Sequence, residues 1–233
     1  MRKFFISISL LFVLFVGAVI VVPEVIDWNH FKSTIQDQVK RATGRTIIIG
    51  GDLDFTFLPV PRLSAKDIRW ANIKGGTSPV LFELDDLDIQ IRVFPLIRGR
   101  LEISSIVLIN PKILLERLAN NQVNWESAPF SLSGVIPKPN LLGNKSLGVS
   151  SAPMQLDELL IKNGTVVWRD AMAGSEEQLT EINLRLGARS LNGPFDLSGH
   201  FLLRNVKAKI NAALGELKKT SAAPLSLTVI LPE

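Results

Sequence analysis

The chain has 233 residues, enough for one large domain or two small ones. It contains no cysteine, which excludes disulfide frameworks, thiol catalysis and cysteine-based metal sites. Its 26 basic residues include Arg2 and Lys3, which precede a long uncharged segment; without these two, 24 basic residues stand against 22 acidic ones. So small a positive surplus argues against a nucleic-acid-binding protein, which needs a clustered basic face.

The first 23 residues are predicted to form a transmembrane anchor. Residues 4–22 contain no charged side chain, and an uncharged helix of this length spans about 30 Å, the hydrocarbon thickness of a bilayer. A cleaved signal peptide is the alternative, but the segment is longer than the usual apolar core and ends without a small-residue cleavage site. Basic residues before the segment and acidic residues after it place the N-terminus in the cytoplasm. In a bacterium, the anchor would then lie in the inner membrane and residues 24–233 in the periplasm.

An amphipathic helix is predicted directly after the anchor, over residues 27–43. Its apolar residues recur at steps of three and four, which places them on one helical face: Trp28, Phe31, Ile35, Val39 and Ala42. Asp27 or Asn29 can cap its start, and Gly44 can end it. The preferred interpretation buries the apolar face against the rest of the domain; in the alternative, the helix lies on the membrane surface.

Beyond Gly51 the apolar period changes from 3.6 to 2, which is typical of antiparallel strands with one apolar and one wet face. The clearest segments alternate at Leu53, Phe55 and Phe57, at Leu87, Ile89, Ile91 and Val93, and at Phe195, Leu197, Gly199, Phe201 and Leu203. The body of the chain is therefore predicted to be mainly β, a long antiparallel meander of roughly ten strands.

The predicted meander has an interruption near its middle. Residues 24–126 hold the helix and the first half of the sheet, and residues 154–233 hold the second half. Between them, residues 127–153 are rich in Ser, Pro and Gly and carry only two charges, Lys138 and Lys145. This composition favours a linker or insertion. A lid over an apolar groove is the alternative, because the segment also carries several large apolar side chains.

A weak internal repeat spans the interruption. The series Ile103, Ile106, Leu108, Asn110 and Ile113 recurs 53 residues later as Leu156, Leu159, Ile161, Asn163 and Val166. Each copy is expected to be a strand that ends in Asn at a turn, with the next strand beginning directly after it. Many hairpin proteins produce such a pattern, so its meaning depends on whether the strands form a repeating sheet.

The sequence contains no convincing constellation for catalysis, metal binding or cofactor binding. His30 and His200 are the only histidines, and neither has a second ligand at metal spacing. The densest acidic cluster, Asp85, Asp86 and Asp88, is expected to form a solvated strand face. We therefore expect a protein that is not an enzyme and holds neither a metal nor a cofactor.

Several short motifs follow the predicted anchor in a specific order. They are Ile26-Asp27-Trp28-Asn29, Thr43-Gly44-Arg45, Gly51-Asp52-Leu53, Leu58-Pro59-x-Pro61, Phe94-Pro95-Leu96-Ile97-Arg98-Gly99, Leu108-Ile109-Asn110-Pro111, Asn124-Trp125 and Asn163-Gly164, then Asp170 and the segment 187–199. Together they resemble the AsmA family, anchored envelope proteins of Gram-negative bacteria, over nearly the whole chain.

The resemblance implies a bridge-like lipid-transfer protein, in which a long antiparallel sheet curls into a groove with an apolar interior. Such a groove would hold the acyl chains of phospholipids through burial of methylene groups alone. The lipid-facing candidates are Leu53, Phe55, Phe57, Leu87, Ile89, Ile91, Val93, Phe195, Leu197, Phe201 and Leu203, and Gly199 is expected to widen the lumen. The alternative that the family implies is a non-enzymatic scaffold that affects outer-membrane protein assembly, with envelope proteins as partners.

Overall fold

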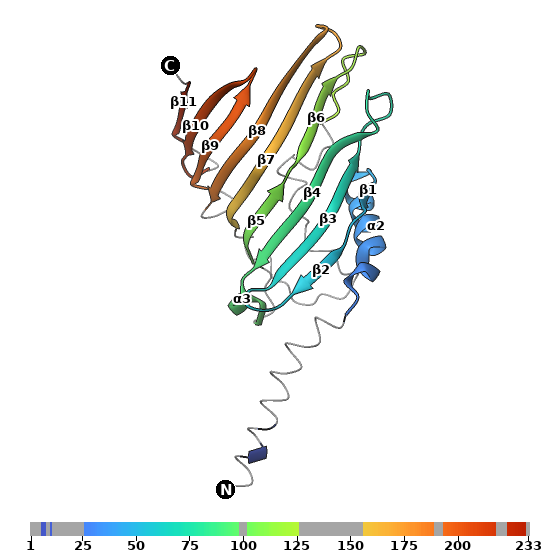
Figure 1. Ribbon diagram of the computed structural model, residues 1–233, viewed down its shortest axis with the longest axis vertical. Helices are drawn as coiled ribbons and strands as arrows, with labels where there is room; N and C mark the ends of the chain where they lie inside the picture. Colours follow the sequence, from blue (N-terminus) through green and yellow to red (C-terminus); the bar gives the residue numbers. More distant parts are fainter. Residues whose placement is uncertain are drawn as a thin grey trace.

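One eleven-stranded sheet organises the part of the chain that the structure describes. The computed structural model describes residues 6, 7, 10, 26–97, 102–125, 156–188, 193–217 and 223–231. The elements are η1 (Trp28–Phe31), α2 (Lys32–Thr43), β1 (Ile47–Ile49), β2 (Leu53–Thr56), β3 (Arg62–Ala71), β4 (Val80–Ile91), α3 (Val93–Ile97), β5 (Ile103–Ile109), β6 (Lys112–Arg117), β7 (Leu156–Asp170), β8 (Ser175–Ala188), β9 (Phe195–Leu203), β10 (Val206–Leu214) and β11 (Leu225–Ile230). The expectation of a mainly β protein is confirmed (Figure 1).

The strand order shows that the sheet is not a simple meander. Its main path is β1-β3-β4-β5-β7-β8-β9-β10-β11, with β2 paired to β3 and β6 paired to both β4 and β7. β5 and β6 together run antiparallel to β4 but parallel to β7. The prediction of an antiparallel meander is therefore wrong at this one junction. Parallel neighbours require a long connection, and residues 118–155, which contain the predicted insertion, separate β6 from β7 in the sequence.

The internal repeat corresponds to this parallel junction. Ile103 pairs with Leu156, Ile106 with Leu159 and Ile113 with Val166, so the two copies lie side by side in register. In neither copy does the chain reverse direction at the Asn, as it would in a hairpin turn. Asn110 and Asn163 adopt left-handed backbone conformations, with φ of 53° and 54°. Asn163 lies within β7, and Asn110 lies between β5 and β6, which both pair with β4 and β7.

A transverse line of such irregular positions crosses the sheet. Asp67 in β3 and Glu181 in β8 also have positive φ, and side-chain hydrogen bonds link neighbouring strands along the line. Asn110 Nδ2 donates to Asp85 Oδ2 at 2.8 Å, and Asn163 Nδ2 donates to Asn110 Oδ1 at 2.8 Å. One extra residue in a strand moves all later side chains to the other face. Because neighbouring strands shift at the same line, their apolar face stays continuous.

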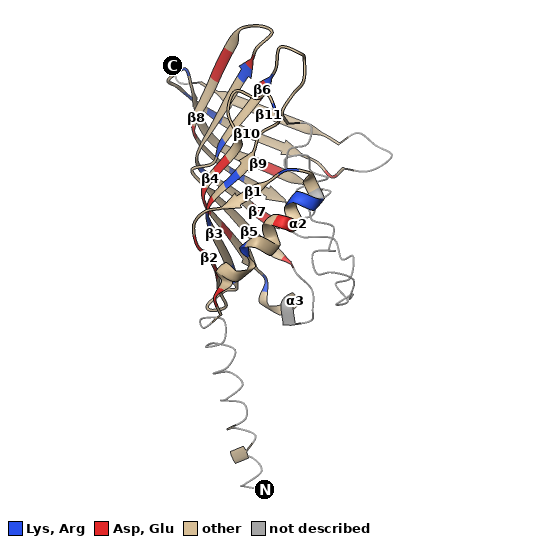
Figure 2. Ribbon diagram, turned by 90° about the vertical axis from the view of Figure 1, so that its right-hand side faces the viewer, with Lys and Arg blue, Asp and Glu red and all other residues tan. Residues whose placement is uncertain are grey.

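Helix α2 packs against one face of the sheet, which we call the inner face (Figure 2). Ile35 and Val39 from the helix contact the buried cluster formed by β1 to β4. The predicted helix over residues 27–43 is confirmed, although its first turn is the 3₁₀ helix η1. The contacts of Ile35 and Val39 favour the interpretation that the apolar face of the helix is buried against the domain. Phe31 is an exception and remains 47% exposed. Gly44 ends α2 with a φ of 74° and donates its N–H to Lys40 O at 2.8 Å.

Two predicted segments lie largely or wholly outside the described residues. Of the predicted membrane span, only residues 6, 7 and 10 are described, and residues 127–153 are not described at all. Within the described part of the chain, no helix is both long enough and apolar enough to cross a membrane.

Candidate functional site

The inner face carries apolar rows that run across the strands. The first row follows the pairing register from β2 to β11 through Phe55, Leu63, Ile89, Ile106, Leu159, Leu186, Leu197, Ala212 and Leu227. The second runs through Leu53, Ala65, Leu87, Leu108, Ile161, Leu184, Gly199, Ile210 and Val229. Neighbouring strands lie about 4.8 Å apart, so each row extends on the order of 40 Å.

A third row lies on the other side of the transverse line. It passes from β1 to β10 through Ile47, Trp70, Phe82, Ile113, Val166, Leu179, Leu203 and Val206. Every member of the three rows is apolar or glycine. A surface of this length and composition can contact hydrocarbon, and the buried indole N–H of Trp70 is the one polar side-chain group among the members of the three rows.

The inner face is closed at one end and open at the other. Over β1 to β4, α2 covers it, and Leu53, Leu84 and Ile49 are buried in a single core cluster. Over β9 to β11 the same rows are half-buried or exposed, and Leu227 reaches 61% exposure. The closed end is a hydrophobic core, whereas the open end leaves apolar surface for another molecule.

An apolar hollow of about 230 Å³ lies between these two ends. It is lined by Pro111, Ile113, Ile161, Gly164, Thr165, Val166, Leu179, Ile182, Leu184, Phe201 and Ile210. The lining residues flank the transverse line, because the extra residues bend the strands there. Gly164 helps to keep the space open, since an added Cβ would lie 2.9 Å from Ile161 Cγ2.

The structure divides the predicted lipid-facing residues into groups. Leu53, Phe55, Leu87, Ile89 and Ile91 lie toward the helix-covered half, in β2 and β4, whereas Phe195, Leu197, Phe201 and Leu203 lie on β9 in the open half. Only Phe201 of these lines the hollow. The remaining lining residues were missed, although the 53-residue repeat contains Ile113, Ile161 and Val166 and could have pointed to them.

Three of the predicted residues have a different structural context from the one expected. Phe57 lies beyond the end of β2, in the loop that leads to β3. Val93 is the first residue of α3, because Pro95 has no N–H for a sheet but fits the first turn of a helix. Gly199 was expected to widen the lumen, and the structure gives it a packing role between two strands. An added Cβ would lie 2.0 Å from Asn183 O, so glycine is needed for the close approach of β9 to β8.

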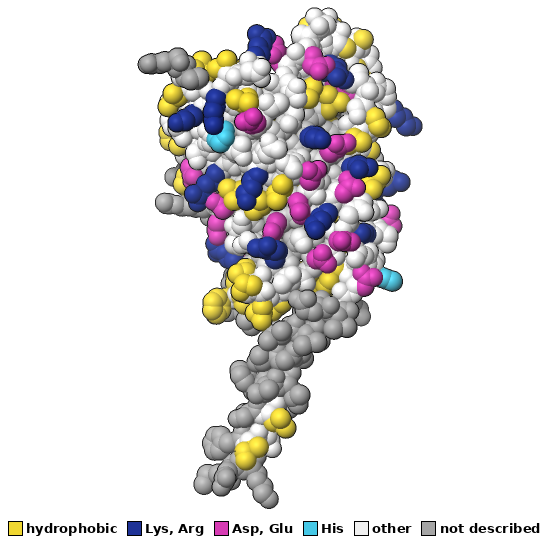
Figure 3. Space-filling view, in the orientation of Figure 1, with side chains coloured by type: hydrophobic (Ala, Val, Ile, Leu, Met, Phe, Trp, Pro, Cys, Tyr) yellow, Lys and Arg dark blue, Asp and Glu magenta, His cyan; other side chains and the backbone are white. Residues whose placement is uncertain are grey.

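On the outer face of the sheet, acidic and basic side chains are intermixed, with smaller hydrophobic patches between them (Figure 3). Arg62 Nη1 lies 3.2 Å from Asp88 Oδ2 beside a polar hollow of about 430 Å³ that Asp54, Lys66 and Asp86 also line. Among the described residues that line this hollow, Arg62 and Asp88 form an ion pair. Among the described residues, no group of three or more His, Asp or Glu side chains is arranged to hold a metal ion.

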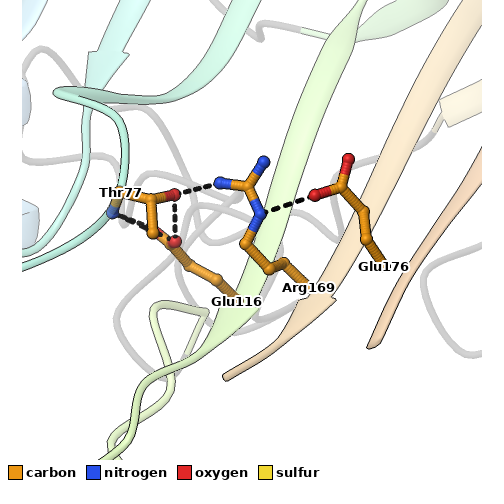
Figure 4. Close-up of polar contacts among 4 residues, drawn as sticks. All are labelled: Thr77, Glu116, Arg169 and Glu176. Carbon is orange, nitrogen blue, oxygen red and sulfur yellow. Dashed lines mark hydrogen bonds and ion pairs between the residues drawn. The ribbon is translucent and has the colours of Figure 1, made fainter. Parts of the chain in front are cut away.

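A buried carboxylate fastens one end of the sheet (Figure 4). Glu116 in β6 is 1% exposed and accepts hydrogen bonds from the Thr77 N–H at 3.1 Å, from Thr77 Oγ1 at 2.7 Å and from Asn72 Nδ2. Arg169 donates to Thr77 Oγ1 and, through Nε, to Glu176 Oε2 at 2.8 Å. The β3–β4 loop is thereby joined to β6, β7 and β8, so this end of the sheet is held by polar contacts.

Replacing Glu116 by Ala is expected to destabilise the fold without changing the inner face. The substitution leaves buried donors of Asn72 and Thr77 without an acceptor, which costs about 2–4 kcal/mol in the free energy of unfolding. Chemical denaturation in detergent, followed by tryptophan fluorescence, measures the change. The control is Glu176→Ala, which removes an exposed ion pair worth less than about 1 kcal/mol. Equal effects of the two variants would contradict the assignment of Glu116 as the anchoring acceptor.

Near the same end, Arg45 follows α2 and donates from Nη2 to Asn124 O at 2.8 Å. Burial lowers the pKa of Arg45 below its ordinary value. Asn124 is fully buried and completes this network by accepting the Glu116 N–H at 2.9 Å and donating to Leu114 O at 2.8 Å. These contacts satisfy backbone groups, so the network stabilises the sheet end and presents no reactive group to the inner face.

These features define a class, a predominantly β protein in which one long sheet presents a continuous apolar face. Comparison with known proteins gives the family. A sequence model of the AsmA family matches residues 1–226, and the chain belongs to this family. A search of curated proteins finds no significant match. Membership of the AsmA family suggests a lipid-related function in the cell envelope.

Proposed function

We propose that this protein is anchored in the bacterial inner membrane and binds phospholipid acyl chains on the inner face of its periplasmic sheet, for lipid homeostasis of the outer membrane. The observation that carries the proposal is the set of apolar rows, which continue from the helix-covered core onto half-open strands. Apolar surface left in water is unfavourable. Each methylene group of a ligand that is buried against this face contributes about 0.8 kcal/mol to the free energy of binding.

The chemistry of the inner face fits a chain of methylene groups better than a polar ligand. The lining of the hollow holds one hydroxyl side chain, Thr165, and no charged side chain. Hydrocarbon needs no hydrogen-bond partner, whereas a polar group placed there would lose its hydration without compensation. The proposed activity is therefore binding and conduction without catalysis.

Native mass spectrometry of the detergent-extracted full chain tests the proposal. We expect phospholipid to remain bound after exchange into a detergent that removes loosely associated lipid. The same preparation from Phe201→Glu, which places a carboxylate in the hollow, serves as the matched comparison. Lipid-free protein from the unmodified chain would contradict the proposal.

A scaffold that affects outer-membrane protein assembly is the second candidate, and one observation favours it. All residues of β11 are exposed, and within the described residues this strand pairs only with β10. An exposed apolar edge strand can accept a strand from another protein. A stoichiometric envelope protein without lipid in the mass spectra would favour this second function.

A further inference from the structure

α3 and the β2–β3 loop lie at the same end of the sheet (Figure 1), and both carry large apolar side chains that are exposed. Phe94 in α3 is 79% exposed, and Leu58 and Val60 in the β2–β3 loop are exposed by 48% and 41%. Ile26, where the described chain begins again after residue 10, is 40% exposed. It also lines the polar hollow beside Arg62 and Asp88. We call these four residues the apolar rim.

Two sets of contacts hold the apolar rim in place. The Ile91 N–H donates to Pro61 O at 2.8 Å, which ties the β2–β3 loop to the end of β4. Arg92, just before α3, donates its backbone N–H to Glu102 O at 2.9 Å and forms ion pairs with Glu102 and Asp157. The hydrogen bond with Asp157 raises the pKa of Arg92 above its ordinary value. Phe94 is therefore exposed on a helix whose preceding residues are held by hydrogen bonds and ion pairs.

The covalent chain places Ile26, one of the four residues of the apolar rim, close to the proposed anchor. Only Glu24 and Val25 separate Pro23, which follows the uncharged segment, from Ile26. An extended chain covers at most about 3.5 Å per residue, so Ile26 lies within about 14 Å of the end of that segment. If the segment spans the membrane, the nearest apolar phase for these side chains is the bilayer itself.

We propose that the apolar rim inserts into the periplasmic surface of the bilayer, with Phe94 and Leu58 in contact with acyl chains. This inference rests on the proposed membrane anchoring and adds a second attachment, by which the sheet stands on the lipid surface in a defined orientation. Aromatic and aliphatic side chains at such a position bind the interface by burying apolar area.

The orientation bears on how lipid reaches the inner face. Ile91 pairs with Ile103, which pairs with Leu156, and these residues form the apolar row nearest to α3. With the apolar rim in the bilayer, this row adjoins the hydrocarbon, and an acyl chain can pass to the inner face without crossing water. The proposed docking thus provides an entrance.

The absence of cysteine makes a direct test available. Phe94→Cys in the full chain is labelled with an environment-sensitive nitrobenzoxadiazole dye and reconstituted into vesicles of phosphatidylethanolamine and phosphatidylglycerol. Met172→Cys is the matched control, since Met172 is 59% exposed and lies in the β7–β8 turn at the opposite end of the sheet (Figure 1). We expect dye at position 94 to shift its emission to the blue and to be quenched at least about twofold by lipid with a nitroxide on its acyl chain. Dye at position 172 should show neither change.

Flotation of the same vesicles separates the two proposals. If the protein floats with the vesicles but the dye at position 94 behaves like that at position 172, the docking proposal is wrong and the anchor stands. A blue shift without quenching by nitroxide lipid would show that protein, such as a second copy of the chain, covers Phe94, and would also overturn it. Failure to float would contradict both the anchor and the docking. Dye on Leu58→Cys should report the same environment as dye on Phe94→Cys. Because Leu58 lies outside α3, agreement would show that the result does not come from a distortion of α3 by the Phe94 substitution.

Discussion

Phe201→Glu is expected to reduce photo-crosslinking to phospholipid by about tenfold while the sheet remains folded. Phe201 lies on β9 in the open half of the inner face and lines the apolar hollow. A carboxylate at this position disfavours contact with an acyl chain. Loss of contact with about two methylene groups, each worth about 0.8 kcal/mol, lowers binding about tenfold. Phe201 is only half-buried, so in the empty hollow the carboxylate can remain hydrated and the fold is preserved; it loses its hydration only when an acyl chain covers it.

Ser198→Glu is the control for this experiment. Ser198 lies on the same strand but on the exposed outer face, and it pairs with Arg185 in β8. The new charge should leave both crosslinking and thermal unfolding unchanged. Crosslinking from a lipid with a photoreactive acyl chain, followed by measurement of cooperative melting, distinguishes the outcomes. If Phe201→Glu instead yields protease-sensitive material, Phe201 belongs to the structural core and the hollow is not a binding surface.

Ile49→Asp is expected to have the largest effect on stability. Ile49 in β1 is 7% exposed and belongs to the core cluster beneath α2. An aspartate there would be cut off from water without a partner, which costs about 4 kcal/mol or more and is enough to unfold many domains. Urea denaturation in detergent, monitored by tryptophan fluorescence, measures the loss.

Strand β1 supplies an unusually close control, because its sequence is three consecutive isoleucines. Ile48 lies between two buried residues, points to the other face and is 52% exposed. The same change, Ile48→Asp, should cost less than about 1 kcal/mol. Similar losses for Ile48→Asp and Ile49→Asp would mean that the inner and outer faces have been assigned wrongly at the closed end.

The sequence by itself determined the features that depend on neighbouring residues in the chain, namely the strands and the helix. The alternation at Leu53 and Phe55 and at Leu197 and Phe201 predicted strands with one apolar face, because successive side chains in a strand point to opposite sides. The stripe of Ile35 and Val39 predicted a helix packed on the sheet, and Gly44 predicted its end. The order of short motifs indicated the AsmA family, which the match over residues 1–226 confirms.

Only the tertiary structure decided how these strands are arranged. The parallel pairing of β5 and β6 with β7 joins segments 53 residues apart, and alternation along one strand contains no information about its neighbour. The left-handed positions at Asn110 and Asn163 looked like turns, because Asn favours both turns and strand bulges with positive φ. The apolar hollow and the division into a covered and an open half depend on these pairings and on where α2 packs, which are properties of the assembled sheet.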